Sequence, residues 1–506
     1  MKRRETFGLA AGFAISALGV GRSSAARDTA DDEVLAGIMA RLAATGRTYL
    51  PSGTYKLSKP LVIPPGVLEG GRVTLDFRDA DPANFPDRIC VLVKGAPKTR
   101  LPDLSGNLTI GADLFRFKAP HGLSAGDAFQ LSGTVDFAGN GYRHYYRKGE
   151  IFRVEHVVDA TTVRVAAGCR DTYRAAEVEV WKRAGDRFTQ ACTSLTILGR
   201  DDIKLSLRLA ALDRTVIDNV RVERGKHSAL SFTDCFGITG ENIVARQFSD
   251  AHEGYGILVG NSQDVRLRGD VYGYFNGIAV GGGLTKGGKI GMNRDIHFEG
   301  TGASDPVGGL SGANFHGNTE YSSYRGTFRN GVTLAGNKNE AHDEFIGGSG
   351  RSVIRFGEMH GHEFRVSGVA RTNGADLKIQ HGAIHQPDYG MHARYGGRTV
   401  LDLQLHVAQA TRIIWWRPQK LSRADAVLEL RLDIVEAHPT TRFMALRRQG
   451  LKGRAFPSVE LRQFVLRDDR VPIRWWVDKD TRLGGSAAAN ALSAKRAIIS
   501  RAQAYK

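Results

Sequence analysis

The chain has 506 residues, of which 61 are glycine, 15 are proline and 8% are aromatic, so it can bury a sizeable core and is neither collagen-like nor disordered in composition. Its net charge of +17 favours a polyanionic partner, such as an acidic polysaccharide, a nucleic acid or an anionic surface. The four cysteines are far apart without a C-x-x-C pair, which argues against zinc, and a chain of this size does not need a disulfide framework.

Residues 1–26 have the pattern of an export signal. Lys2, Arg3 and Arg4 precede an apolar run from Phe7 to Val20, and small residues follow it. The adjacent arginines favour twin-arginine export, with an ordinary secretory signal as the alternative. The run is too short for a confident membrane span. We therefore expect a periplasmic or secreted protein with no stable membrane span after processing.

Residues 27–100 predict a capping helix and the first coils of a solenoid. From Asp28 to about Gly46, apolar residues recur at helical spacing. The stretch "RTYLPSGTYKLSKPLVIPPG" that follows (Arg47 to Gly66) reads as short strands divided by proline and glycine turns. Residues 101–190 have a different sequence pattern. Pairs of strands with alternating apolar and polar residues replace the short strands divided by proline and glycine. We interpret them as an inserted β subdomain held off the main body.

Residues 191–480 are repetitive. Short apolar strands end in glycine and a polar residue, as in "GILVGN", "GIAVGG", "ANFHGN", "VTLAGN" and "VIRFGE". Several neighbours lie roughly 20 residues apart, a period typical of a stacked solenoid. No helical pattern lies between the strands, and Asn261, Asn318 and Asn337 share one corner position. The pattern predicts an all-β parallel β-helix, with the N-terminal helix covering its open end. We predict a helical tail over residues 481–506.

The first coil resembles that of pectate-lyase-like proteins, with their "lPaGtY" pattern. This superfamily of right-handed parallel β-helices includes pectate lyases, polygalacturonases and phage tailspike depolymerases. The resemblance implies the fold and a polysaccharide substrate. It does not imply a reaction, because the fold hosts lyases, hydrolases and proteins without activity. It also leaves open a homotrimer, as tailspikes form.

Four polar clusters flank the middle strands. They are "SDAHEGYG", "FHGNTEYSSYRG", "GNKNEAHDEF" and "FGEMHGHEF", and we expect them to line one groove along the solenoid. His316 aligns with Val259, Val280, Ala335 and Phe356, so it places a histidine in an apolar column. We predict catalytic residues among His316, Tyr321, Tyr324, Glu340, Asp343, Asp250 and Glu253. We predict substrate-binding residues among Arg325, Lys338, Asn318, Asn339, His252, Glu320 and Glu358.

Two reactions fit these residue types. In β-elimination, His316 and Tyr321 or Tyr324 serve as base and acid, while Arg325 and Lys338 neutralise the uronate carboxylate. In hydrolysis, Asp250 or Glu253 acts with Glu340 or Asp343 as a carboxylate pair. The paired-aspartate signatures by which polygalacturonases resemble one another are absent, which disfavours that type of hydrolase but not others. The basic charge and the cluster of His, Tyr and Arg residues favour elimination. A non-catalytic carbohydrate-binding protein is a further alternative.

The prediction is therefore an exported lyase that cleaves an acidic polysaccharide. No metal site is predicted, and Ca²⁺ is left as an optional cofactor. Nucleic-acid binding is disfavoured because the sequence has no recognition motif.

Overall fold

The computed structural model describes residues 24–136, 146–249, 253–281, 291–347, 353–359 and 363–372, and thereafter the strands named below as far as residue 502. The predicted signal lies outside these residues apart from its last three positions. Asp250 and His252 also lie outside them, and Glu358 is described by its backbone alone.

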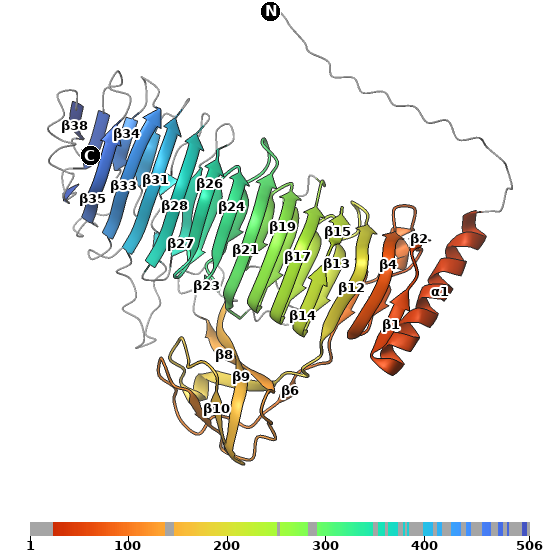
Figure 1. Cartoon of the computed structure of the whole chain (residues 1–506). Coiled ribbons are helices and arrows are strands. Elements are labelled where there is room, and N and C mark those ends of the chain that lie inside the picture. The colour runs from red at the N-terminus through yellow and green to blue at the C-terminus, as the bar shows by residue number, and fades with distance from the viewer. Residues whose placement is uncertain are drawn as a thin grey trace, which may run out of the picture.

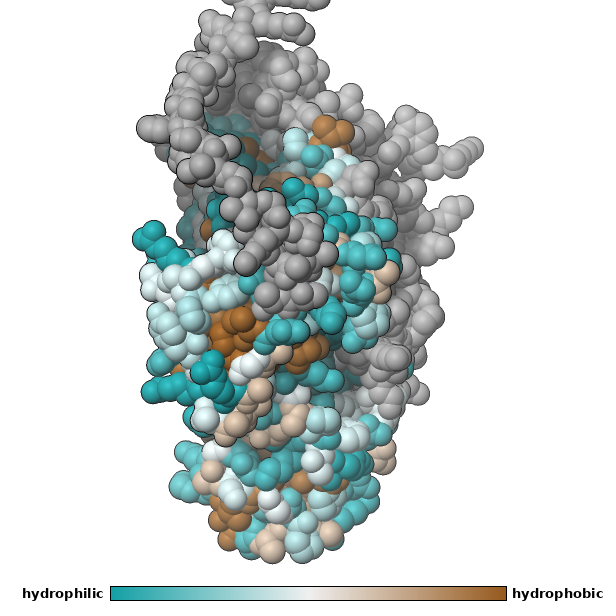
Figure 2. Space-filling view, turned by 90° about the vertical axis from the view of Figure 1, so that its right-hand side faces the viewer, coloured by the Kyte–Doolittle hydropathy of each residue, from teal (hydrophilic) through white to brown (hydrophobic). Residues whose placement is uncertain are grey.

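Helix α1 (Ser24–Thr45) covers the N-terminal end of a long stack of strands (Figure 1). Its buried stripe is Leu35, Ile38, Met39 and Leu42, spaced as one face of a helix, and the opposite face is exposed. Gly46, at φ 70°, ends the helix and donates its N–H to Leu42 O. Seen from this end, polar areas surround smaller apolar ones (Figure 2). The predicted helix is confirmed, and it shields the first coil from water.

Two parallel sheets run the length of the stack, and each coil of the chain adds strands to both of them. Sheet A consists of β1 (Arg47–Leu50), β2 (Gly53–Lys56), β4 (Gly66–Asp76), β12 (Phe188–Leu198), β14 (Asp213–Asp218), β15 (Val220–Glu223), β17 (Phe236–Arg246), β19 (Gln263–Gly273), β21 (Asn293–Ser304), β23 (Thr319–Glu320), β24 (Ser323–Arg329), β26 (Glu340–Ile346), β28 (Glu363–Thr372), β31 (Arg398–Val407), β33 (Val427–Glu436), β35 (Ser458–Leu466) and β37 (Leu483–Gly484).

The strands of the second sheet are shorter. Sheet B consists of β3 (Leu61–Ile63), β5 (Ile89–Lys94), β13 (Leu205–Ala210), β16 (Ser228–Thr233), β18 (Tyr255–Gly260), β20 (Asn276–Val280), β22 (Ser311–Phe315), β25 (Val332–Gly336), β27 (Ile354–Met359), β29 (Lys378–Ile379), β30 (Gly382–Ala383), β32 (Arg412–Trp416), β34 (Arg442–Leu446), β36 (Arg474–Asp478) and β38 (Ile498–Ala502). This arrangement confirms an all-β parallel β-helix.

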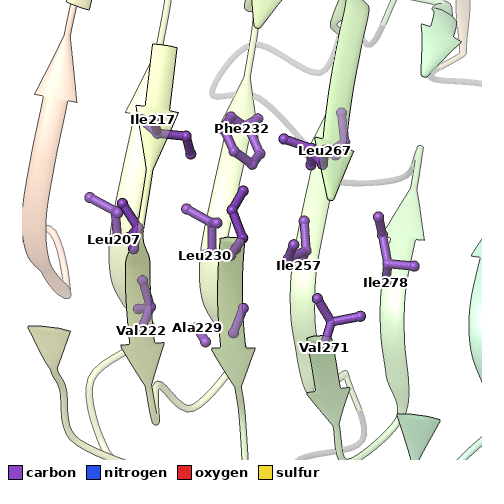
Figure 3. Packing of buried hydrophobic residues seen from close by; sticks show 14 of the residues in the cluster. Leu207, Ile217, Val222, Ala229, Leu230, Phe232, Ile257, Leu267, Val271 and Ile278 are labelled. Carbon is purple, nitrogen blue, oxygen red and sulfur yellow. The ribbon is translucent and has the colours of Figure 1, made fainter. Parts of the chain in front are cut away.

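Apolar ladders fill the space between the two sheets. Leu207, Leu230, Ile257 and Ile278 pair in register across four successive strands of sheet B and are buried (Figure 3). Leu267 of sheet A belongs to the same core. Each such side chain contributes about 1.5–3 kcal/mol by leaving water. The ladders explain why the strands are short. Each strand contributes only a few inward residues, which stack on their equivalents in the coils on either side.

Residues 99–182 leave the stack between β5 and β12 and form a separate sheet, which we call the insertion (Figure 1). Its strands run in the order β6 (Thr99–Arg100), β11 (Val178–Lys182), β8 (Ala128–Asp136), β9 (Arg147–Asp159), β10 (Thr162–Val165) and β7 (Leu114–Arg116), and all pairs are antiparallel. Phe115, Phe129 and Phe152 pack together at its centre. The insertion therefore has its own core.

The expectation that the insertion is held off the main body is wrong. Arg294 of β21 is fully buried and forms ion pairs with Glu150 of the insertion at 3.0 Å and with Glu320 at 3.0 Å. Gln263 of β19 bonds both the N–H and the carbonyl oxygen of Ile151. Strand β9 therefore packs along the starts of the sheet A strands, which fixes the insertion against the body.

The C-terminal segment also differs from the prediction. Strand β38 pairs in parallel with β36, so residues 498–502 extend sheet B where a helix was expected. A sheet edge left open presents backbone N–H and C=O groups for pairing, and Ile498 and Ile499 are β-branched residues that suit a strand. Pairing with the edge of β36 therefore accounts for the strand at residues 498–502.

Candidate functional site

The predicted clusters lie at two different corners of the coil. At the B–A corner, the chain passes from a sheet B strand to the next sheet A strand. His316 and Tyr321 lie there in one coil, and Lys338 lies there in the next. At the A–B corner, it returns to sheet B, and Glu253 lies there just before β18. A single groove containing all four clusters is therefore not formed. His316 and Glu340 do lie near the same corner.

His316 is not in the apolar column that the sequence alignment indicated. Val280 pairs with Phe315, so Phe315 continues the column of Val259 and Val280, and His316 follows one position later. The prediction aligned the repeats by their glycines, and this alignment is one residue out of the register seen in the structure. A shift of one residue moves a side chain to the other face of a strand. His316 is half-buried, and its ring Nε2 lies 3.4 Å from Asn314 Nδ2.

Tyr321 is the centre of a group contributed by both parts of the molecule. The guanidinium carbon of Arg170, from the insertion, lies 4.6 Å from the ring centroid, and Lys338 Nζ lies 4.9 Å from it. Arg170 is held by an ion pair to Asp295 at 2.6 Å, and its N–H donates to the carboxylate of Glu150. We call His316, Tyr321, Lys338 and Arg170 the corner cluster. Its cations can attract an acidic group to the tyrosine.

Tyr324 cannot act as the catalytic acid in this structure. It is fully buried and stacks on Phe315, with ring centroids 3.8 Å apart and an interplanar angle of 7°. Burial raises the pKa of Tyr324 well above its ordinary value. The residue precedes Arg325 on a strand whose alternate positions face inward, and this alternation places it in the core.

Three predicted binding residues hold the corner together and are closed to substrate. Asn339 is fully buried, accepts a bond from Ser322 N–H and donates to Thr319 O and Ala335 O. Asn318 is also fully buried and donates to Gly291 O. Glu320 is buried against Arg294. Asparagine side chains replace backbone partners where the chain turns, so their role here is structural.

The outward face of sheet A carries a second group. Glu340 and His342 lie two residues apart on β26, so both face outward, and Glu340 Oε2 lies 3.0 Å from His342 Nε2. The neighbouring strands place Arg325 and Ser367 on either side of His342 in register. Arg325 is exposed. This surface is contiguous with the corner cluster, because Lys338 precedes Glu340 by only two residues.

Asp343 occupies a position that glycine holds in neighbouring coils. Its register partners are Gly326 and Gly368, both at φ 127°, and Asp343 itself has φ 85°. A Cβ added to Gly368 would overlap the carbonyl oxygen of Asp343, so this bend is tightly packed. Asp343 is exposed at the bend in an unfavourable backbone conformation for a residue with a side chain.

Glu253 belongs to a different environment. Its side chain is 68% exposed, and it lies 3.5 Å from His227 Nε2. His227 is packed edge-on against Tyr255, and burial lowers its pKa to about 4. Since this pair lies at the A–B corner, Glu253 does not face Glu340 across a glycosidic bond. Glu253 therefore cannot form the carboxylate pair for hydrolysis with Glu340 or Asp343 that the sequence suggested.

Sequence reasoning missed Arg170 and Ser367. Arg170 is 151 residues from Tyr321 along the chain and meets it only because the insertion packs on the B–A corner. His342 lies in the predicted cluster "GNKNEAHDEF", but it was not among the predicted catalytic or binding residues. The Glu-x-His spacing on an alternating strand was a signal for it, since such residues share one face.

Within the described ranges, no helix is long and apolar enough to cross a membrane. Over the same residues, no group of three or more His, Cys, Asp or Glu side chains is arranged to hold a metal ion. All four cysteines are free and buried. Burial raises the pKa of the Cys90 and Cys169 thiols to about 12 and of the Cys192 and Cys235 thiols to about 11, which makes them poor nucleophiles.

The comparisons agree with the parallel β-helix fold and with the pectate-lyase-like resemblance of the first coil. A family model described as "Gp49, pectin lyase-like" matches residues 223–393. Among solved structures, the chain is similar to tailspike gp61 of Pseudomonas phage phi297, with a TM-score of 0.65 and 16% identity over 89% of this chain and 73% of that one.

Two other tailspikes show the same likeness. For gp49 of Pseudomonas phage LKA1 the TM-score is 0.63, with 18% identity over 89% of this chain and 74% of that one. For Gp54 of Acinetobacter baumannii bacteriophage AP22, in complex with a capsular saccharide of A. baumannii, the TM-score is 0.67, with 16% identity over 93% and 76%. No curated protein matches the chain.

Proposed function

We propose that this protein binds an acidic polysaccharide along the B–A corner and cleaves it by β-elimination at the corner cluster. The observation that carries the proposal is the placement of two cations, Arg170 and Lys338, on the ring of Tyr321 next to a histidine-bearing corner. Similarity to a tailspike solved with a capsular saccharide supports a saccharide ligand. The net charge of +17 supports an acidic one.

In the proposed reaction, Arg170 and Lys338 neutralise the uronate carboxylate. This makes the neighbouring C–H more acidic, and His316 accepts its proton. The electron pair forms a carbon–carbon double bond, the glycosidic C–O bond breaks, and Tyr321 donates its proton to the leaving oxygen. The product is one unsaturated uronate end and one free hydroxyl end. A homotrimer and an exported location remain predictions that accompany this proposal.

The test uses purified acidic polysaccharides of bacterial and plant origin. The wild type should generate ultraviolet absorbance from the unsaturated end, and Tyr321→Phe should lower the rate by about 100-fold, within the range for loss of a general acid. Tyr49→Phe is the matched control, because Tyr49 is 57% exposed at the capped end of the stack.

The outcomes separate the candidate functions. New reducing ends without ultraviolet absorbance would show hydrolysis, and saturable binding with neither signal would show a binding protein. Either result would overturn elimination. Equal rates for Tyr321→Phe and the wild type would remove Tyr321 from the reaction.

A further inference from the structure

Three side chains on the outward face of sheet A form a hydrogen-bonded chain. Ser367 Oγ lies 2.7 Å from His342 Nδ1, and His342 Nε2 lies 3.0 Å from Glu340 Oε2. His342 is 15% exposed and Glu340 is 45% exposed at their side chains. Ser367 is half-buried. A hydroxyl, an imidazole and a carboxylate in this order are the parts of a serine nucleophile with its base and its orienting group.

The β-helix itself builds this order. Ser367 of β28 is the direct register partner of His342 of β26, so their side chains stand next to each other on one face. Glu340 precedes His342 by two residues and shares that face. All three groups lie on strands of sheet A, just before the bend at Asp343 and Gly368.

We propose that Ser367, His342 and Glu340 form an esterase centre that removes acyl groups from hydroxyls of the bound polysaccharide. The choice of a saccharide ester rests on the proposed function, since Lys338 of the corner cluster lies two residues before Glu340. The ester chemistry itself does not depend on β-elimination.

The reaction needs only water as a second substrate. Ser367 Oγ attacks the ester carbonyl while His342 takes its proton, and Glu340 holds the imidazolium that results. The bond to the sugar oxygen breaks, and that oxygen receives the proton from His342. Water, activated by the same histidine, then hydrolyses the acyl-serine, which releases a carboxylic acid and restores the hydroxyl.

Two arginines lie beside the three residues on sheet A. Arg365 precedes Ser367 by two residues on the same face of β28 and is exposed. Arg325 is the register partner of His342 on its other side. Positive groups near a developing oxyanion lower the barrier to its formation.

Strands β21 and β24 of sheet A offer an internal comparison. His297 Nδ1 lies 2.8 Å from Ser323 Oγ, so a second histidine–serine pair occupies the same face. Its corresponding acid, Asp295, forms an ion pair with Arg170 at 2.6 Å. Asp295 is thus engaged by the insertion, whereas Glu340 bonds His342. Ser323 is therefore a matched control for Ser367.

The experiment measures hydrolysis of p-nitrophenyl acetate and acetate release from chemically O-acetylated polygalacturonate by the full-length protein. Ser367→Ala should lower both rates by at least about 100-fold, and Ser323→Ala should stay within about twofold of the wild type. A fluorophosphonate probe should label the wild type at Ser367, located by peptide mass spectrometry. Thermal unfolding confirms that both variants fold.

Wild-type rates equal to buffer, an unchanged rate in Ser367→Ala, or labelling at another serine would overturn the esterase. The ultraviolet absorbance that the wild type generates from non-acetylated polysaccharide is recorded in parallel. If the wild type generates none, elimination is rejected while the esterase result stands, so the two failures are distinguishable.

Discussion

At the scale of single residues, burial decides which titratable groups can do chemistry. Tyr324 and Tyr321 are three residues apart, yet one stacks inside the core and the other meets two cations at the corner. Asn339 and Lys338 are adjacent, yet one is fully buried and the other is exposed. Residue type alone therefore does not identify the site.

Burial also predicts an acid sensitivity at His227. Its neighbours are Lys204, Ser228, Glu253 and Tyr255, and its folded pKa is about 4 against 6.5 for the free side chain. Between these values the unfolded chain binds a proton that the folded chain does not. The free energy of unfolding should therefore fall as pH drops from 6.5 to about 4, by about 3 kcal/mol for this group.

The measurement is chemical denaturation of the wild type and His227→Gln across that pH range. The variant should show a shallower loss of stability between pH 6.5 and 4. His156→Gln is the control, because His156 is exposed on the insertion. Parallel pH profiles for the wild type and His227→Gln would contradict the assignment.

At the scale of elements, the insertion is fixed by buried charge. Replacing Arg294 by Met leaves Glu150, Asp171 and Glu320 without their common partner at the interface. Losing one partner of a buried ion pair costs about 3–5 kcal/mol. We expect Arg294→Met to lower the melting temperature and to make the insertion sensitive to limited proteolysis.

Arg268→Met is the matched control. Arg268 forms an ion pair with Glu299 on the outer surface of sheet A, and its side chain is 62% exposed. Such surface ion pairs contribute at most about 1 kcal/mol to stability. A melting temperature for Arg294→Met as high as that of Arg268→Met would show that the buried network does not hold the insertion in place.

At the scale of the whole molecule, the excess of positive charge should govern affinity for a polyanion. Salt screens charges over about 10 Å at 0.1 M ionic strength. Binding of polygalacturonate, measured by calorimetry, should therefore weaken steeply as sodium chloride rises. Uncharged dextran is the control ligand. Affinity for polygalacturonate that does not change with salt would show that the charge of +17 serves another purpose.

The sequence by itself determined the parallel β-helix and its capping helix. Glycine-ended apolar hexamers and the helical spacing of Leu35, Ile38, Met39 and Leu42 are local patterns, and each one specifies its own element. It also indicated the neighbourhood of Tyr321, Lys338 and Glu340, because polar residues clustered at the ends of predicted strands.

Only the tertiary structure decided the register and the partners of these residues. It moved His316 out of the apolar column, placed Tyr324 in the core, and separated Glu253 from Glu340. It also brought Arg170 to Tyr321 and Ser367 to His342. The physical reason is that stacking coils and packing the insertion create contacts between residues distant in sequence, and a one-residue shift reverses which face a side chain occupies.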